Sequence, residues 1–444
     1  MLHARWGNLL YNTLNTESKI KLPRPGRNHD CRMAYCEHRE INPDENEPYA
    51  RMDTQILTYH EDFLELCEHI RKSGIVAFDS EFVSDISYRP ELGLLQFATP
   101  ERCVAVDPLA VATLTSWWDI MADDSTTVIV HGGQAEMKFC VQMSGQIPRK
   151  LIDVQIAEGL RGRSYPLSYT AIVERVLGKK VASNQTRTDW LRRPLSPEQI
   201  HYALEDAAFL PEIWARQRKS LESKGRLHWA HAEFDRMCQD IFEEERIPPW
   251  ERVSGIHKLP RRELLVAQRL ATWREEEAAY RNRPPRRIIR DDLLIDLAKR
   301  RPKTVQQALA TRDLNRPEYK KRLDDIVAVI EEACSVPDDK LPPRLRSRDE
   351  FSSDEQVISR LVGLALGNVC AELDIAQSLV GTSRDLTELV RAVRSGEISE
   401  TPRLLDGWRG EAFGDLLRDV LGGKVRFRVA PPNSSTPLIF EAQE

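Results

Sequence analysis

The sequence predicts a mixed α/β domain followed by two small all-α units. Residues from about 55 to 225 alternate between short apolar runs, typical of strands, and stretches with helical periodicity. Beyond residue 225 the strand signals almost disappear, and residues 339–352, rich in proline and arginine, separate two groups of helices. At about 150 residues per domain, a chain of 444 residues has room for two to four domains.

Short apolar runs bounded by polar turns give the predicted strands of the first domain. These runs are residues 75–78, 94–98, 103–107 and 128–130. A polar turn joins the second and third runs, as in a hairpin, and a helix is expected from about residue 134 to 143. A strand-rich half followed by helices indicates one mixed sheet flanked by helices.

A later helix of this domain carries the clearest start signal in the chain. Ser196 is a favourable N-cap, Pro197 suits the first helical position, and Gln199 completes a capping box. Pro211 should kink this helix or end its first segment, because proline has no backbone N–H to donate. Further helices are expected at about 261–282, 291–300, 303–311, 316–334 and within 353–423.

Composition and charge exclude several classes of protein. We expect no membrane span, because no run approaches about 18 uncharged apolar residues, and no secretion, because the N-terminal region lacks a signal-peptide apolar block. Eight cysteines in 444 residues are too sparse for a disulfide scaffold and favour a reducing, cytoplasmic location. The net charge of -5 excludes a protein that coats nucleic acid through bulk charge.

Residues 1–50 are expected to be a disordered N-terminal extension, with scattered prolines and charges and no sustained period. An internal methionine leaves open whether this stretch is translated. His29, Cys31, Cys36 and His38 could form a small zinc site by residue type. Because the Cys-x4-Cys spacing is wider than in most zinc knuckles, we favour the unstructured extension.

Two carboxylates close the first predicted strand. Asp79 and Glu81 occupy positions i and i+2, so both side chains project from one face. Ionised carboxylates this close repel each other unless a cation lies between them. Taken alone, the pair reads more readily as two solvated acids at a strand end.

Two helices add further acids to this pair. Tyr202 and Asp206 are i and i+4 on the capped helix, and are therefore neighbours on one face. Glu136 lies in the first turn of an earlier helix, where the helix dipole alone would stabilise it. Together, four carboxylates from separated segments suit Mg²⁺ or Mn²⁺, which take oxygen ligands. Two such ions about 4 Å apart can promote phosphodiester hydrolysis.

The acids lie within three ordered motifs. The first is Asp79-Ser-Glu81-Phe-Val with Tyr-x-Pro-x-Leu-Gly-Leu-Leu-Gln96, and the second is His-Gly-Gly-x-x-Glu136-Met. The third runs from Arg187-Thr-Asp-Trp-Leu-x-Arg-Pro-Leu to Tyr-Ala-x-x-Asp206. Over about residues 55–220 the chain resembles ribonuclease D, in the Tyr-containing branch of the DEDD 3′→5′ exonucleases. The resemblance implies a ribonuclease H-like α/β exonuclease fold.

The resemblance also implies roles for these residues. The catalytic set would be Asp79, Glu81, Glu136, Tyr202 and Asp206. The four acids would hold two Mg²⁺ or Mn²⁺ ions, Glu81 would also approach the terminal 3′ hydroxyl, and Tyr202 would position the attacking water. The family has Asp where this chain has Glu136, whose extra methylene extends the carboxylate by roughly 1.5 Å. Altered metal preference and lost activity stay open, but we expect retained activity because the other site residues are intact.

The helical half resembles the same family. Leu264–Arg274 and Pro284–Arg287 are similar to the HRDC domain that follows the nuclease, and Leu379–Arg409 looks like its second HRDC-like unit. The predicted boundaries are 1–50 for the extension, 51–225 for the exonuclease domain, 226–259 for a connector, 260–338 for the HRDC domain, 339–352 for a linker, 353–425 for the second HRDC-like domain and 426–444 for a C-terminal tail.

Local basic residues offer candidate contacts to nucleic acid. Residues 281–303 hold an excess of arginine and lysine over acids, which could neutralise phosphates or simply form a solvated rim. Arg187, the predicted substrate-binding residue, and Arg193 lie in the loop before the capped helix, better placed to contact a strand near the metals.

The resemblance implies a metal-dependent 3′→5′ exoribonuclease that releases nucleoside 5′-monophosphates. Its substrates would be tRNA precursors or other structured RNA 3′ ends, and a monomer is favoured. A DNA 3′→5′ exonuclease would use the same acids. No residue in the sequence indicates recognition of the 2′ hydroxyl, which distinguishes RNA from DNA. A catalytically impaired RNA-binding protein would instead use the HRDC-like units, with Glu136 marking a decayed site. No phosphate-binding loop or Gly-x-Ser-x-Gly motif supports an ATPase or a serine hydrolase.

Overall fold

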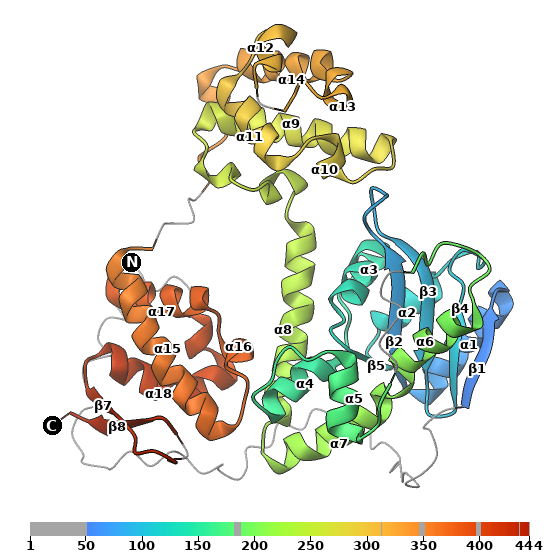
Figure 1. Cartoon of the computed structure of the whole chain (residues 1–444), viewed down its shortest axis with the longest axis vertical. Helices are drawn as coiled ribbons and strands as arrows, with labels where there is room; N and C mark the ends of the chain where they lie inside the picture. The colour runs from blue at the N-terminus through green and yellow to red at the C-terminus, as the bar shows by residue number, and fades with distance from the viewer. Residues whose placement is uncertain are drawn as a thin grey trace, which may run out of the picture.

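The computed structural model describes residues 51–181, 188–311, 313–345, 351–396, 401–434 and 436–443. An α/β domain, a first helical unit and a second helical unit surround the long helix α8 (Leu227–Arg246), which stands near the centre of Figure 1. The expected extension 1–50, including Cys31 and Cys36, and the expected substrate contact Arg187 lie outside the described residues.

One mixed sheet of six strands forms the centre of the α/β domain. Its strand order is β1-β4-β3-β2-β5-β6, with β2–β3 and β3–β4 antiparallel and the other pairs parallel. This is the mixed sheet flanked by helices that the sequence predicts. The strands are β1 (Arg51–Leu57), β2 (Ile75–Val83), β3 (Glu91–Ala98), β4 (Arg102–Val106), β5 (Thr127–Val130) and β6 (Leu151–Asp153).

Alternation along β2 separates an apolar face from a polar one. Phe78 stacks on Phe97 of β3 with ring centroids 5.2 Å apart and contacts Trp117 at 4.6 Å, forming an aromatic layer on one face. Burying each such ring stabilises the fold by about 1.5–3 kcal/mol. Because side chains alternate along a strand, Asp79 and Glu81 project from the opposite face. The core of the sheet thereby fixes the direction of both acids.

The helices of this domain cover both faces of the sheet. On the aromatic face, Phe139 of α3 packs edge-on against Phe82 of β2. On the opposite face, α6 contacts β1 to β4, and Figure 1 shows it lying across them. The helices are α1 (His60–Ser73), α2 (Thr115–Met121), α3 (Gln134–Ser144), α4 (Val154–Arg161), α5 (Tyr169–Leu177), α6 (Pro197–Ala208) and α7 (Leu210–Ser223).

The start and end predicted for the capped helix are confirmed by α6. The Ser196 side chain accepts from the Gln199 N–H, and the Gln199 side chain accepts from the Ser196 N–H, which completes the capping box. The helix ends at Ala208, and Pro211 lies in the first turn of the next helix, where its missing N–H needs no partner.

The first helical unit has a hydrophobic core of its own, separate from that of the sheet. Leu264, Leu294 and Ile326 are buried in it, and each comes from a different helix. Its elements are η1 (Pro249–Arg252), η2 (Ile256–Lys258), α9 (Arg261–Tyr280), α10 (Pro285–Ile288), α11 (Asp291–Arg300), α12 (Val305–Leu309), α13 (Pro317–Lys320), α14 (Leu323–Ser335) and η3 (Asp338–Lys340).

The tip of the β2–β3 hairpin contacts the end of α9 in this unit. The Tyr88 N–H donates to Asn282 Oδ1 at 3.1 Å, and Asn282 Nδ2 lies 3.3 Å from Glu91 Oε1. Asn282 follows α9 with a positive φ of 46°, a conformation that asparagine tolerates better than most residues. The first helical unit is therefore attached to the α/β domain at the hairpin as well as through α8.

The second helical unit shares one continuous core with the α/β domain. The Ala376 N–H donates to the Gly159 carbonyl at 2.8 Å, and Trp408 stacks on Trp229 of α8 with ring centroids 4.9 Å apart. Its helices are α15 (Ser353–Leu373), α16 (Gln377–Val380), α17 (Ser383–Ser395), η4 (Arg403–Leu405) and α18 (Gly407–Leu421). By length and composition alone α15 could cross a membrane, alone among helices of the described residues. Its apolar residues Val362 and Leu366 are buried in the shared core, which accounts for its composition.

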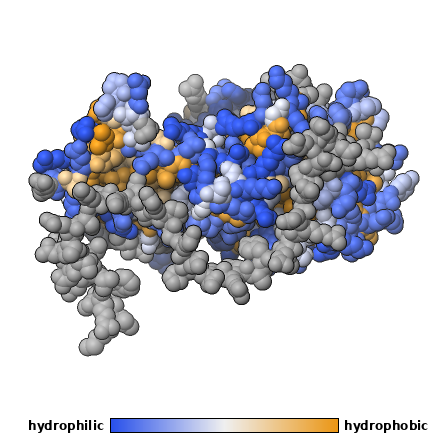
Figure 2. Space-filling model, turned by 90° about the horizontal axis from the view of Figure 1, so that it is seen from below, coloured by the Kyte–Doolittle hydropathy of each residue, from blue (hydrophilic) through white to orange (hydrophobic). Residues whose placement is uncertain are grey.

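Two stretches differ from the expected boundaries. The connector 226–259 contains α8, whose Phe234 and Cys238 are buried in the core of the α/β domain. The C-terminal range 426–444 was expected to be a tail, but it takes part in an antiparallel hairpin of β7 (Val425–Val429) and β8 (Leu438–Ala442). Valine and phenylalanine alternate with arginine along β7, and β8 begins with three apolar residues that can pair with them. The apolar patch at the left of Figure 2 lies on the side where this hairpin is found in Figure 1.

Candidate active site

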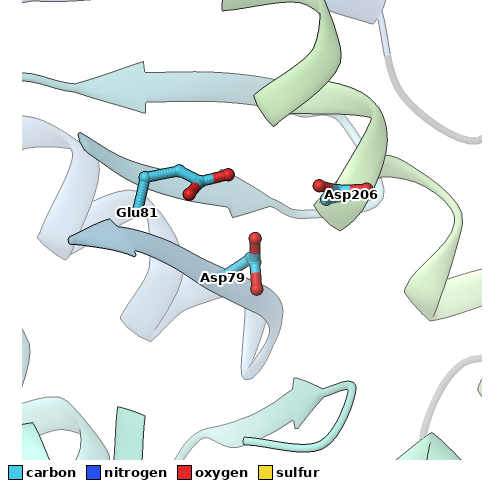
Figure 3. A group of neighbouring side chains, drawn as sticks. All are labelled: Asp79, Glu81 and Asp206. Carbon is cyan, nitrogen blue, oxygen red and sulfur yellow. The ribbon is translucent and has the colours of Figure 1, made fainter. Parts of the chain in front are cut away.

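Three carboxylates from two elements converge between the sheet and α6. Carboxylate oxygens of Asp79, Glu81 and Asp206 all lie within 4.8 Å of one another. Figure 3 shows the first two on β2 and the third on α6, with the side chains directed toward a common space. The structure thus brings together three of the four acids that the sequence singles out.

A close approach of the preceding loop to β3 positions α6. A Cβ atom on Gly93 would lie 2.6 Å from the Cβ of Trp190, so only glycine lets the two segments meet this closely. Arg193 Nη2 and Nε each lie 2.6 Å from an Asp107 carboxylate oxygen, and Nη2 also donates to the Gly93 carbonyl at 2.7 Å. Arg193 is therefore an anchor for the loop. The expectation that it contacts a nucleic-acid strand is wrong for this geometry, because its donors are engaged within the protein.

Burial disfavours the charged forms of all three acids, and repulsion from neighbouring carboxylates adds to this effect. Burial, then the nearby charges of Glu136 and Asp206, hold the pKa of Asp79 well above its usual range. Burial and the charges of Asp206 and Glu136 raise the pKa of Glu81 to about 8. Burial raises the pKa of Asp206 to about 7, partly opposed by a hydrogen bond from the Tyr202 hydroxyl. A cation between them would relieve this repulsion.

Two tyrosines border the acids. Tyr202 lies one helical turn before Asp206 and hydrogen-bonds its carboxylate, as the i and i+4 spacing predicts. The hydroxyl of Tyr169, at the start of α5, donates to the Glu205 carbonyl in the last turn of α6. Carbonyls in a last helical turn lack intrahelical partners, so Tyr169 satisfies one of them beside the site. Tyr169 could not be predicted from the sequence, because nothing local links it to α6.

Glu136 lies behind the three converging acids. Its carboxylate is buried and accepts a hydrogen bond of 2.6 Å from the Ser80 hydroxyl, the strand residue between Asp79 and Glu81. Burial raises the pKa of Glu136, and the Ser80 hydrogen bond lowers it. The charge of Glu136 still acts on its neighbours, as the raised pKa of Asp79 and Glu81 shows.

A buried aspartate holds the turn that leads to Glu136. Asp153 accepts hydrogen bonds from the backbone N–H groups of Gly132, Gly133 and Gln155 at 3.0, 3.2 and 2.8 Å. Gly132 has a positive φ of 62°, and a Cβ on Gly133 would lie 2.4 Å from a Val130 methyl. Both glycines are therefore required by the turn. In the sequence these glycines are recognisable only as part of a motif, and Asp153 carries no local signal of its role.

The chemistry of the converging oxygens fits a hard divalent cation. Asp79, Glu81 and Asp206 offer only carboxylate oxygens, the ligand type that Mg²⁺ and Mn²⁺ take. Within the part of the chain that the structure describes, none of the three forms a salt bridge with Lys or Arg. Among the described residues, the protein therefore supplies no cation that compensates their charges.

The basic stretch 281–303 is partly neutralised within the first helical unit. Arg281 pairs with Glu277, and Arg290 pairs with Asp292 and Asp313 at 3.0 and 3.1 Å. Basic residues of the stretch for which no ion pair is found among the described residues are Arg283, Arg287, Lys299, Arg300, Arg301 and Lys303. The stretch therefore leaves part of its charge available at the surface.

Two segments of the chain match known protein families. Residues 54–222 match the family described as 3'-5' exonuclease, and residues 263–330 match the HRDC domain. A protein named Ribonuclease D from Bartonella henselae is 31% identical over 385 residues, which cover 85% of this chain and 92% of that protein. Ribonuclease D of Escherichia coli K12 is 28% identical over 375 residues, covering 83% and 99% of the two chains.

Solved structures share the fold over most of the chain. The crystal structure of Escherichia coli RNase D, described as an exoribonuclease involved in structured RNA processing, aligns with a TM-score of 0.73 at 27% identity and covers 84% of this chain and 99% of that one. A protein from Bifidobacterium adolescentis aligns with a TM-score of 0.62 at 22% identity, covering 85% and 100% of the two chains. The second match shows the shared fold alone.

Proposed function

Because this chain belongs to the ribonuclease D family and is a 3′→5′ exoribonuclease, we propose that it hydrolyses RNA with divalent metal ions held at the acids of β2 and α6. The observation that carries the proposal is the convergence of Asp79, Glu81 and Asp206 within 4.8 Å without a basic partner among the described residues. Products would be nucleoside 5′-monophosphates released one at a time from the 3′ end.

The proposed ligands are the three converging acids, with Glu136 supporting a second ion. Two divalent ions would supply an activated water and stabilise the leaving oxygen of the phosphodiester. The protein contributes rigidity to this arrangement. Asp79 and Glu81 are fixed by the paired strand β2, and Asp206 by a capped helix whose preceding loop is anchored through Arg193.

Tyr202 is the proposed water-positioning residue. Its hydroxyl hydrogen-bonds Asp206, and burial together with the charge of Asp206 raises the pKa of Tyr202, so the hydroxyl keeps its proton. A protonated hydroxyl beside the acids can accept from, or donate to, a water molecule. Tyr202 therefore orients the water and does not act as a general base.

The substrate proposal is RNA with a structured 3′ end, including tRNA precursors. The net charge of -5 suits capture of a single end in a pocket better than tracking along a duplex. Basic residues of the stretch 281–303 that lack an ion pair among the described residues could contact RNA phosphates beyond the pocket. We also propose a cytoplasmic location and a monomeric state.

Paired degradation assays test this function. RNA and DNA of one sequence, each labelled at the 3′ end, are incubated with Mg²⁺ or Mn²⁺ and the protein. We expect labelled nucleoside 5′-monophosphate from RNA, none with EDTA, and less product from DNA. Faster release from DNA would identify a DNA exonuclease. Degradation of neither, with RNA still bound, would identify an RNA-binding protein.

The matched variants are Asp79→Asn and Asp85→Asn. Both remove one carboxylate charge from the same segment, but Asp85 is exposed at the tip of the β2–β3 hairpin. Asp79→Asn should abolish turnover and leave RNA affinity largely intact, because the protein would still bind the end of the RNA strand. Asp85→Asn should keep full activity. Unchanged turnover in Asp79→Asn would reject the site.

A further inference from the structure

Gln96, in the middle of β3, is a fully buried amide without a hydrogen-bond partner among the described residues. Its side chain has 0% exposure, and neither Nε2 nor Oε1 contacts a donor or acceptor among the described residues. Most buried polar side-chain atoms have a partner, and one left without a partner destabilises the fold. An unpaired buried group calls for an explanation, and a functional role is one such explanation.

The strand register places Gln96 on the same face as the site. Gln96 lies directly opposite Asp79 in the antiparallel β2–β3 pair, and cross-strand partners project to the same side of a sheet. The adjacent pair, Phe78 and Phe97, stacks on the other face at 5.2 Å. Gln96 therefore projects with Asp79 toward α6, away from the aromatic layer.

Of the two cross-strand partners of Gln96 on this face, only one has a polar side chain. Its partner on β4 is Ala105, which offers only a methyl group, and its partner on β2 is Asp79. Above this face α6 presents the small buried residues Ala203 and Ala207. The amide is thus enclosed beside the carboxylate of Asp79, in a position that substrate cannot reach.

We propose that Gln96 is a positioning residue of the acid site, with an amide poised to donate a hydrogen bond to the Asp79 carboxylate when that carboxylate holds a divalent cation. Carboxylates that bind metal ions are themselves hydrogen-bonded by a second layer of residues, which orients them. The amide has no partner among the described residues because it pairs with the Asp79 carboxylate only when that carboxylate is oriented to hold a cation. This inference rests on the proposed function and adds a residue to that site.

Calorimetric titration with Mn²⁺, without RNA, tests the proposal on the full chain. The variant is Gln96→Met, which keeps the length of the side chain and removes both polar atoms. Loss of second-layer partners typically weakens metal binding or activity by about 10–100-fold. We expect Mn²⁺ affinity to fall at least about 10-fold and kcat to fall with an unchanged KM. The midpoint of thermal unfolding without metal should rise, because an unpaired buried polar group is removed.

Gln217 on α7 is the matched control. It is also a fully buried glutamine, but its Nε2 donates to the Val154 carbonyl and to Glu158, both at 3.0 Å. Gln217→Met should lower the unfolding midpoint and leave Mn²⁺ affinity unchanged. Opposite shifts in stability and metal affinity therefore separate a positioning role from a packing role.

The possible results distinguish this inference from the proposed function. Wild-type Mn²⁺ affinity and kcat in Gln96→Met would overturn the positioning role alone. Absence of Mn²⁺ binding by the wild-type protein would overturn the metal site itself, and the inference with it. If Gln96→Met does not fold, Gln96→Leu gives the same comparison, since it also lacks polar atoms and fits a smaller volume.

Discussion

The hydroxyl of Ser80 donates a hydrogen bond of 2.6 Å to the carboxylate of Glu136. Both residues are buried, and Ser80 lies between Asp79 and Glu81 on β2. This contact shows how the chain holds a glutamate at the position where the resemblance to ribonuclease D implies aspartate. The longer side chain reaches β2 and is held there, close enough for its charge to raise the pKa of Asp79 and Glu81.

Removal of the Ser80 hydroxyl should destabilise the protein. In Ser80→Ala the buried carboxylate of Glu136 would lose its side-chain donor, which costs about 1–3 kcal/mol. Urea denaturation measures the change. Ser223→Ala is the control, because that hydroxyl bonds an exposed backbone carbonyl, and it should change stability by less than about 0.5 kcal/mol. Equal stability of Ser80→Ala and wild type would contradict the role of this hydrogen bond.

Replacing Glu136 by aspartate, the residue that the family resemblance implies, should lower activity. In Glu136→Asp the carboxylate would be drawn back by one methylene from the position that α3 and Ser80 now give it. A misplacement of about 1 Å can cost up to about 100-fold in rate, so we expect kcat to fall between about 10- and 100-fold. Single-turnover assays on 3′-labelled RNA measure it. Activity equal to or above that of wild type would show that the site is not built around glutamate.

Stability of the metal-free protein should depend on pH through the site acids. The pKa of Glu81 is raised to about 8 and that of Asp206 to about 7. Between about pH 5 and pH 8 the folded state therefore holds protons that the unfolded chain has released, so stability falls as pH rises. Adding Mn²⁺ should reverse the fall, because the ion binds the deprotonated carboxylates.

Thermal unfolding in EDTA and in Mn²⁺, at pH 6 and pH 8, measures this dependence. The stabilisation by Mn²⁺ should be larger at pH 8 than at pH 6. Asp206→Asn should reduce both the pH effect and the stabilisation, because it removes one of the titrating ligands. Stabilisation by Mn²⁺ that is equal at both pH values would contradict the raised pKa of the acids.

The stability of the second helical unit should depend on one buried ion pair. Arg409 of α18 donates to both oxygens of Glu233 on α8, at 2.5 and 2.9 Å, and both side chains are almost fully buried. Arg409→Met would leave the buried carboxylate short of its main partner, which costs about 3–5 kcal/mol. Arg418→Met, on the same helix, removes an exposed pair with Asp415, worth about 0–1 kcal/mol. A similar loss of stability in the two variants would contradict this role for the ion pair.

The ion pair of Glu233 also makes stability depend on pH, in the direction opposite to that of the site acids. Hydrogen bonds from Arg409 and Arg236 outweigh burial and lower the pKa of Glu233 to about 2. The stability that this group contributes is complete above its ordinary pKa of 4.5 and is lost as pH falls toward about 2. Acid titration of Arg409→Met, followed by tryptophan fluorescence, should show a smaller loss over this range than wild type. An equal loss in both proteins would contradict it.

Local signals in the sequence were sufficient to predict the elements whose starts or ends they mark clearly. The capping box at Ser196 and Gln199 placed α6, and the spacing of Tyr202 and Asp206 placed both side chains on one face of it. Period-two alternation placed Asp79 and Glu81 together. These predictions depend only on neighbours in the chain, which is why they could be made from the sequence.

Features that depend on distant contacts could not be predicted. Tyr169 reaches the end of α6, and Arg193 reaches Asp107, only after the chain has folded. Arg193 looked like a free cation because its acidic partner is 86 residues away in the sequence. The C-terminal hairpin was hidden by its prolines and serines, which mark the turn between two short apolar strands.

Diffraction from crystals grown with Mn²⁺ decides whether the acids of β2 and α6 hold a metal ion, because anomalous scattering locates the ion. We expect an Mn²⁺ peak bound by carboxylate oxygens of Asp79, Glu81 and Asp206, at about the 2.0–2.1 Å that is typical of bound Mg²⁺. The peak should disappear in Asp79→Asn. A peak elsewhere, or no peak at saturating Mn²⁺ with these three acids ordered, would contradict a metal site at β2 and α6.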